Sequence, residues 1–316
     1  MTESVILPKH WTLRQRLKNH CIYFAIRLLW TLLGSLPSSL QRWFCSNLAI
    51  VAYYFAPRER RLAHQNLKLA FPNLTEEEMK RVIRDMFHHF GQSVAELLNL
   101  DESVAKCISH DANAEAFNAL EESLKEKAGA IVVTGHIGNW ELMAQAFSRA
   151  GFPISSVAKP IYDPRLTAWV DDLRGRYGMK TLWRGQSEGF KAILRVFRAQ
   201  ETFGILIDQD TKVPGDFVPF FGKPAYTPTA AATLHRRTGA PVLVGCHHRV
   251  DGKHCIRLTR IVADLDPNDP DFDREFTALL TKHLEEAIRR EPAQWVWLHK
   301  RWKTQPVALT EHLGDT

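Results

Sequence analysis

The stretch AIVVTGHIGNWE, at residues 130–141, decides the fold class of this chain. Its first five residues are apolar or β-branched and predict a buried strand that ends at Thr134. Two glycines then allow a tight turn, and Asn139 is a favoured N-cap, so a helix is expected to begin there. Strand, turn and helix in this order form the unit of an α/β protein, in which functional sites collect at the carboxyl ends of the strands.

The same alternation continues toward the carboxyl terminus. Further apolar runs predict strands at 154–158, 179–183, 203–207 and 241–245. Helical patterns lie between the runs at 139–149, 163–177, 187–199 and 229–238. This alternation predicts a mainly parallel central sheet flanked by helices. The turn at 250–253 predicts a hairpin to a last strand at Cys255–Val262, and a long helix is expected at 271–290.

The chain before residue 130 has a different pattern, in which helices follow one another. A helix is expected at 58–71, and a capping box formed by Thr75 and Glu78 opens the next one. We therefore expect the chain to have two parts, a helical membrane-associating segment and an α/β domain, at residues 1–72 and 73–316.

Two apolar runs, Ile22–Leu36 and Trp43–Ala56, carry the membrane prediction. Both are shorter than the roughly 20 residues that a spanning helix needs, and the first contains Arg27. Basic residues flank the pair at both ends, which favours the cytoplasmic side for both ends. We expect a shallow helical hairpin or in-plane helices on the cytoplasmic leaflet. The alternatives are two ordinary buried helices or, less favoured, a cleaved signal peptide.

The charge of the chain is unevenly distributed. The 41 basic and 35 acidic residues give a net charge of +6. The first 70 positions hold ten basic and two acidic residues, so the remaining 246 hold 31 and 33. A globular part without net positive charge argues against a general nucleic-acid binder. Hydrophobic residues at 45% and charged residues at 24% exclude a disordered chain and a polytopic membrane protein. Five cysteines without a CxxC spacing indicate free thiols in a reducing compartment.

We expect His136 and Glu141 to carry the chemistry. A carboxylate on the first helical turn can approach an imidazole that leaves the strand, hold its tautomer and stabilise the imidazolium. His136 would then take a proton from an attacking substrate hydroxyl. The spacing alone is not specific, because His110 and Glu115 share it. The alternatives are a loop histidine and a carboxylate that complements the helix dipole.

Several segments in order carry a family resemblance. They are RERRLAHQNLKLAFPNLT at 58–75, GHIGNWE at 135–141, FGILIDQD at 203–210, FVPFFGKPAYTP at 217–228 and PAQWVWLHKRW at 292–302. Together they resemble the late acyltransferases of lipid A biosynthesis, the lauroyl and myristoyl group of the lysophospholipid-acyltransferase-like superfamily. The resemblance covers nearly the whole chain.

The resemblance implies an acyltransferase at the cytoplasmic face of the inner membrane that uses no cofactor and no metal. An acyl chain would pass from the thioester of acyl carrier protein to a hydroxyl of a lipid A precursor. His136 then corresponds to the general base, and Glu141 stands where the family motif has Asp or Glu. Backbone amides near Gly138 are candidate oxyanion donors.

The segment Asp208-Gln209-Asp210 follows an apolar run and is therefore expected at a strand end. The family pattern suggests that it positions substrate or supports His136. A DxD metal–nucleotide site, as in glycosyltransferases, and a solvated turn are its alternatives. Arg184 falls where related acyltransferases use a basic residue for a substrate phosphate, unless it is a surface charge.

Aromatic residues near the carboxyl terminus have two interpretations. Phe217, Phe220 and Phe221 are expected either to line the acyl channel or to pack in the core. The alternating aromatic residues of WVWLHKRW, at 295–302, predict a half-buried strand, with plain core packing slightly favoured over a membrane-interface or glycolipid contact.

Competing functions follow from the same residues. They are acylation of another glycolipid, a DxD glycosyltransferase, and a non-catalytic lipid-binding or scaffold protein at the membrane. A metal site at His247, His248 and His254 is not expected, because successive strand residues face opposite ways.

Overall fold

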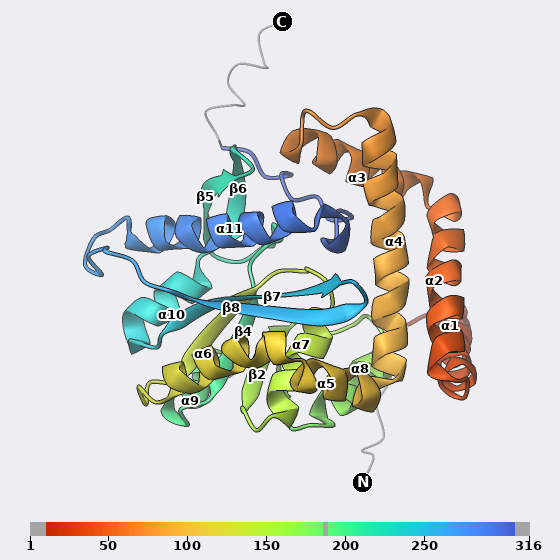
Figure 1. Cartoon of the computed structure of the whole chain (residues 1–316), viewed down its shortest axis with the longest axis horizontal. Helices are drawn as coiled ribbons and strands as arrows, with labels where there is room; N and C mark the ends of the chain where they lie inside the picture. Colours follow the sequence, from red (N-terminus) through yellow and green to blue (C-terminus); the bar gives the residue numbers. More distant parts are fainter. Residues whose placement is uncertain (1–10, 186–188, 307–316) are drawn as a thin grey trace, which may run out of the picture.

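The computed structural model describes residues 11–185 and 189–306, and a six-stranded sheet lies at the centre of this part of the chain (Figure 1). The strand order is β3-β2-β4-β1-β7-β8. The strands are β1 (Ala130–Thr134), β2 (Ile154–Ala158), β3 (Lys180–Trp183), β4 (Thr202–Leu206), β7 (Val242–Val250) and β8 (Lys253–Ile261). All neighbouring pairs are parallel except β7 and β8, which form the expected hairpin. The predicted α/β class is confirmed.

Helices cover both faces of the sheet. They are α5 (Leu100–Ser109), α6 (Ala114–Leu124), α7 (Trp140–Arg149), α8 (Pro164–Gly175), α9 (Gly189–Arg198), α10 (Ala230–Thr238) and α11 (Phe272–Arg290), with a short 3-10 turn at Asp111–Asn113 before α6. Strand β1 shows the two layers directly. Ile131 and Val133 pack with α9, α10 and α11, whereas Ala130 and Val132 pack with α5, α6 and α7. Alternate residues therefore serve opposite faces, as expected of a sheet buried on both sides.

A small hairpin lies apart from the main sheet. Strands β5 (Gly215–Phe220) and β6 (Lys223–Pro228) pair with each other in antiparallel fashion, and β5 packs against α11. The hairpin turns through Phe221 and Gly222, whose φ angles of 52° and 70° give the left-handed backbone of a tight two-residue turn. The sequence pattern did not predict this hairpin.

Four helices form the amino-terminal part: α1 (Leu13–Gly34), α2 (Ser38–Phe55), α3 (Pro57–Ala70) and α4 (Glu76–Leu98). The predicted capping box is confirmed, because Thr75 and Glu78 satisfy each other's backbone amides at the start of α4. Helix α2 packs along α4 (Figure 1). At Gly91 of α4 a Cβ atom would lie 2.4 Å from the carbonyl oxygen of Cys45, so only glycine allows this close approach.

Helices α1 and α2 expose an unusual amount of apolar side chain. No residue of α1 is buried, and Leu13 and Phe55 are 84% and 83% exposed. Within the described residues, no helix combines the length and apolar character required for a membrane span. By contrast, Ala63, Leu67 and Ala70 of α3 lie in the main core, so α3 packs into the α/β part, while the boundary at residue 72 stays a prediction.

The carboxyl-terminal segment differs from the expected strand. After α11 and a 3-10 turn, η2 (Pro292–Gln294), the aromatic segment forms one isolated bridge to the described part of the chain, between Trp295 and Ile137. Its tryptophans nevertheless serve the core: Trp295 and Trp297 are fully buried and Trp302 is 8% exposed. Burial of large aromatic rings, rather than a strand ladder, therefore holds this segment in place.

Candidate active site

The site begins where β1 and β4 end side by side. Thr134 of β1 pairs with Leu206 of β4, so the residues two positions further along each chain leave the sheet at the same level. These residues are His136 and Asp208. The imidazole Nδ1 of His136 lies 2.8 Å from Oδ1 of Asp208, and the backbone N–H of His136 donates to Oδ2 at 2.7 Å. The carboxylate thus fixes both the ring and the backbone of His136.

Burial and the neighbouring charges shift the pKa values of His136 and Asp208 in opposite directions. Burial alone would lower the pKa of His136, but the charge and hydrogen bond of Asp208, helped by the charge of Glu141, raise it above 6.5. Burial would raise the pKa of Asp208, yet the His136 charge and the hydrogen bonds from His136 and Trp295 lower it to about 2. Asp208 therefore stays ionised, and the more basic imidazole keeps Nε2 for an incoming proton once Nδ1–H is donated to Asp208.

Trp295 holds Asp208 from the other side. Its indole N–H donates to Oδ2 of Asp208 at 2.8 Å, and the N–H of Val296 donates to the carbonyl of His136 at 3.1 Å. The carboxyl-terminal segment therefore clamps the loop that carries His136. This role of Trp295 was not predicted from the sequence. The signal for it was that a buried carboxylate needs hydrogen-bond donors, which an indole N–H can supply.

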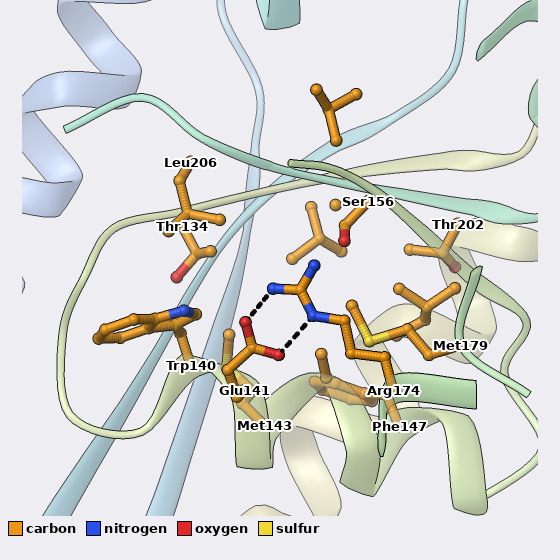
Figure 2. Close-up of a pocket in the computed structure, with 15 residues that line it drawn as sticks. Thr134, Trp140, Glu141, Met143, Phe147, Ser156, Arg174, Met179, Thr202 and Leu206 are labelled. Carbon is orange, nitrogen blue, oxygen red and sulfur yellow. Dashed lines mark hydrogen bonds and ion pairs between the residues drawn. The ribbon is translucent and has the colours of Figure 1, made fainter. Parts of the chain in front are cut away.

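The predicted contact between Glu141 and His136 is not the one that the structure has. Glu141, in the first turn of α7, forms a bidentate ion pair with Arg174 of α8, with Arg174 Nε donating at 2.9 Å (Figure 2). The tautomer-holding carboxylate is Asp208, because helix α7 directs the Glu141 side chain toward α8. Glu141 acts on His136 only through its charge. Nothing in the sequence pattern indicated Arg174.

Gly138 provides the turn but not a free amide. Its φ of 59° is left-handed, and a Cβ atom there would lie 2.1 Å from the carbonyl oxygen of His247. Its N–H donates to the carbonyl of Gln294 at 2.7 Å, so the Gly138 amide itself is not free for an oxyanion, and the expectation of donors near Gly138 stays a prediction for its neighbours. As expected, Asn139 caps α7, with its side-chain oxygen accepting from the Leu142 amide at 3.0 Å.

A buried polar network supports this turn from behind. The amide N–H of Asn139 donates to Nδ1 of His247 at 3.0 Å, and its side chain donates to Glu96 at 2.7 Å. Glu96 also pairs with Arg249. Burial would raise the pKa of Glu96, but the hydrogen bond and charge of Arg249 lower it, so the network holds an ionised carboxylate. Buried hydrogen-bonded networks of this kind make a loop rigid.

The His136 ring faces a cavity of about 560 Å³. Much of its wall is apolar, and its charged residues are Lys159, Arg174 and Arg184; the apolar wall includes Val157, Ile193, Phe203, Ile205, Leu206, Val213 and Leu234. A second cavity of about 60 Å³ shares Trp140, Val157, Arg174 and Leu206 with it and reaches Met143, Phe147 and Met179 (Figure 2). The site therefore joins the His136 imidazole to a largely apolar space.

The remaining polar candidates divide between the cavity and the interior. Arg184 is exposed and lines the cavity, and Gln209 lines it with its amide nitrogen 3.4 Å from Nε2 of His136. Asp210 instead points away, where it accepts from the Thr304 amide at 3.0 Å and lies 3.5 Å from Nζ of Lys303. Asp208 and Asp210 thus have separate partners, which is not the convergent geometry of a DxD metal site.

The three phenylalanines lie mainly in the core. Phe220 is fully buried between the rings of Trp295 and Trp302, and Phe221 is 6% exposed. Phe217 packs edge-on against Tyr226. Since the wall of the His136 cavity, as far as the structure describes it, includes none of the three, the core-packing interpretation describes Phe220 and Phe221.

Cys107, His247 and His254 form the one group of donor atoms close enough for a metal within the described residues. Nδ1 of His247 accepts the Asn139 amide, and its Nε2 lies 3.1 Å from Nδ1 of His254. A neutral imidazole that accepts at Nδ1 carries its proton at Nε2. Metal binding through Nε2 would therefore require an imidazolate, so these residues fit a hydrogen-bonded core better than a metal ligand set.

Fold and site together define an α/β protein in which a histidine paired with a buried carboxylate lines a largely apolar cavity. A model of the bacterial lipid A biosynthesis acyltransferase family matches residues 9–304. The chain belongs to this family of acyltransferases of lipid A synthesis, as the sequence resemblance indicated.

Characterised relatives agree with this assignment. The chain is 26% identical over 306 residues to a lipid A biosynthesis palmitoleoyltransferase of Escherichia coli, covering 95% of this chain and 94% of the relative. It is 25% identical over 303 residues to a lipid A biosynthesis lauroyltransferase of the same organism, covering 95% and 97%. A phosphatidylinositol mannoside acyltransferase of Mycobacterium tuberculosis is 24% identical over 185 residues, covering 58% and 57%.

Proposed function

We propose that this chain transfers an acyl chain from the thioester of acyl carrier protein to a hydroxyl of a lipid A precursor, as a late acylation step. The family assignment supports the reaction class. The observation that carries the proposal for this chain is the His136–Asp208 pair at the mouth of a largely apolar cavity. Such a site combines a base for the acceptor hydroxyl with a place for a fatty acyl chain.

In the proposed mechanism, Nε2 of His136 takes the proton of the acceptor hydroxyl as its oxygen attacks the thioester carbonyl. The C–O bond forms, the C–S bond breaks, and the imidazolium returns its proton to the departing thiolate. Asp208 holds the Nδ1–H tautomer and stabilises the imidazolium throughout. Glu141 contributes its negative charge, and Gln209 and Arg184 contact the substrate from the cavity wall.

The oxyanion requires donors other than Gly138, because that amide is already used. The first four N–H groups of a helix lack partners within the helix. We therefore assign the role to the Trp140 and Glu141 amides in the first turn of α7, since the side chain of Asn139 already caps the Leu142 amide. The ring of Trp140 packs 4.8 Å from that of His136, so this turn lies beside the imidazole.

A direct test uses the purified full chain with acyl carrier thioester and lipid A precursor. We expect a product that is heavier by one acyl group in mass spectra, with activity indifferent to EDTA. The same acyl chain on coenzyme A serves as the control donor. Transfer from coenzyme A at the same rate would contradict the carrier-protein donor, and no transfer from either would contradict the proposed reaction.

We also propose that α1 and α2 lie in the plane of the cytoplasmic leaflet. The exposed apolar side chains of α1 and α2 support this, among them Phe24, Leu28, Leu32, Trp43, Leu48, Tyr54 and Phe55. At about 25 cal/mol per Å² of apolar surface, such a face favours transfer out of water. Because Gln41, Cys45 and Ser46 are buried in α2 and this helix packs on α4, deleting the helix would also uncover α4.

Substitutions on the exposed face therefore test the membrane proposal more cleanly than truncation. We expect Trp43→Glu with Leu48→Glu to move protein from the membrane to the soluble fraction. The control is Lys80→Glu with Arg81→Glu on the exposed surface of α4. If the α2 variant stays with membranes as the wild type does, another surface anchors the protein.

Another glycolipid acceptor is the second candidate, favoured by the partial similarity to the mannoside acyltransferase. Mass spectra of total lipids from a deletion strain distinguish the two. Under our proposal, the lipid that loses one acyl group is lipid A. If a different glycolipid alone loses the acyl group, that glycolipid is the acceptor and the proposed chemistry still applies.

A further inference from the structure

A basic groove lies between α3 and the carboxyl-terminal segment. It encloses about 510 Å³, and its lining residues come from two short stretches, namely Arg58, Glu59, Arg61, Leu62 and Gln65 of α3 and Leu298, His299, Lys300 and Lys303. The mechanism proposed above uses none of these side chains. We call this set of residues the basic groove.

Four cations and one carboxylate surround the groove. Arg58, Arg61 and Lys300 are exposed, and their side chains make no hydrogen bond or ion pair with the described residues 11–185 and 189–306. Glu59 is the carboxylate, and it too has no ion-pair partner among them. The groove therefore presents an excess of positive charge that the fold itself does not neutralise.

The floor of the groove is bonded to the loop that carries Asp208, Gln209 and Asp210. Nζ of Lys303 donates to the carbonyl of Asp210 at 2.8 Å, and Nε2 of His299 lies 3.3 Å from the same oxygen. Burial lowers the pKa of His299, and the charges of Asp208 and His136 also act on it. A ligand in the groove would thus lie beside the loop of Asp208 and Gln209.

The groove also follows directly on the apolar face of α2. Tyr54 and Phe55 at the end of α2 are 63% and 83% exposed, and α3 begins at Pro57, so Arg58 stands three residues after Phe55. Arginine next to exposed aromatic residues is the arrangement found where a protein meets the headgroup layer of a membrane. A lipid in that layer would place its headgroup at the groove.

We infer that the basic groove binds a phosphate monoester on the headgroup of the lipid acceptor. The inference rests on the proposed function, because it assumes that a membrane lipid is the acceptor. Guanidinium groups bind phosphate oxygens in bidentate fashion. A concave groove at the membrane side fits a small phosphorylated headgroup better than the convex surface of an acidic carrier protein.

A binding measurement that needs no catalysis tests the inference. The full chain in detergent is titrated by calorimetry with a soluble glucosamine disaccharide that carries phosphate monoesters, and with the same disaccharide without phosphates. Arg58→Gln with Arg61→Gln is compared with Lys68→Gln with Arg84→Gln, which removes the same charge from exposed positions of α3 and α4 outside the groove. We expect the groove variant to bind the phosphorylated sugar at least about tenfold more weakly than the wild type.

Two results would overturn the inference at this stage. One is equal affinity of the groove variant and the wild type for the phosphorylated sugar. The other is an equal loss in the control variant, which would indicate a general charge effect. Binding that depends on the groove in a protein without acyl transfer would refute the proposed function and leave the phosphate site standing.

Steady-state kinetics separate the acceptor from the donor. We expect the groove variant to raise KM for the phosphorylated acceptor about tenfold, with kcat and the KM for acyl carrier thioester unchanged. With a dephosphorylated acceptor the variant and the wild type should have the same KM. A rise in KM for the carrier thioester instead would make the groove a carrier-docking surface and contradict the inference.

Discussion

The end of strand β4 and the first turn of helix α7 each carry a carboxylate whose charge acts on His136, and the two carboxylates have different surroundings. Asp208, at the end of β4, is buried and accepts hydrogen bonds from His136 and Trp295. Glu141, in α7, is partly exposed and is neutralised by Arg174. Closeness in sequence predicted Glu141 as the carboxylate that pairs with His136. The register of β1 and β4 instead places Asp208 against the imidazole ring.

The two carboxylates act on His136 with different strength. A buried carboxylate with a low pKa is a fixed partner for an imidazolium, and its hydrogen bonds leave it no other orientation. A carboxylate that shares its charge with a guanidinium has a weaker effect on a neighbour. We therefore expect the two acids to differ in what their removal does.

Removing the base itself has the largest expected effect. We expect His136→Ala to lower kcat for acyl transfer about 10³-fold, because general base catalysis contributes roughly 10²–10⁴. The loss is measured with saturating donor and acceptor, and far-ultraviolet circular dichroism checks folding. Near wild-type turnover would remove His136 from the mechanism, and with it the comparison of the two acids.

Removing Asp208 comes next. We expect Asp208→Asn to lower kcat roughly a hundredfold, since the tautomer and the imidazolium lose their partner. The wild-type rate should fall as the pH drops through a His136 pKa above 6.5. Without the Asp208 charge, burial lowers that pKa, so the acid limb should move to lower pH. If the acid side of the pH–rate profile does not move in Asp208→Asn, a group other than His136 determines it.

Much of the fold was predictable from local patterns. Strands β1, β2, β3 and β4 lie within a residue of the predicted runs. The prediction is clearest for β1, which is buried on both faces and therefore has an almost continuously apolar sequence. Hairpin β5–β6 was not predictable, because Pro219, Pro224 and Pro228 argue against strands. In a two-stranded ribbon both strands have a free edge, where proline is tolerated.

The site was predictable only in part. His136 follows from its strand and glycines, and Asp208 from its own strand end. Their pairing requires that β1 and β4 are neighbours and that Thr134 lies opposite Leu206. His136 and Asp208 are 72 residues apart, so no local pattern predicts this register. Trp295 is 87 residues from Asp208, so no periodicity connects them.

Removing Glu141 is expected to have a smaller effect than removing Asp208. We expect Glu141→Gln to lower kcat by less than about tenfold, because a partly exposed ion pair contributes about 1 kcal/mol or less. Kinetics of this variant beside Asp208→Asn under the same conditions provide the measurement. A loss as large as that of Asp208→Asn would reverse the roles that we assign to the two acids.

The tryptophan that supports Asp208 gives the smallest effect. Trp295→Phe removes one buried hydrogen bond, so we expect a stability loss of about 1–3 kcal/mol and an activity loss of a few-fold. Thermal unfolding measures the first and kcat the second. Trp302→Phe is the matched control, because the indole nitrogen of Trp302 has no hydrogen-bond partner. Equal effects in both variants would show that ring packing, rather than the bond to Asp208, matters.

The most direct test of which acid supports the base is the pKa of His136 itself, measured by NMR titration of the imidazole nitrogens in the wild type and both acid variants. We predict a value above 6.5 in the wild type, a value below it in Asp208→Asn, and an intermediate value in Glu141→Gln. If Glu141→Gln lowers the pKa as much as Asp208→Asn does, or more, the assignment of Asp208 as the partner of the base is wrong.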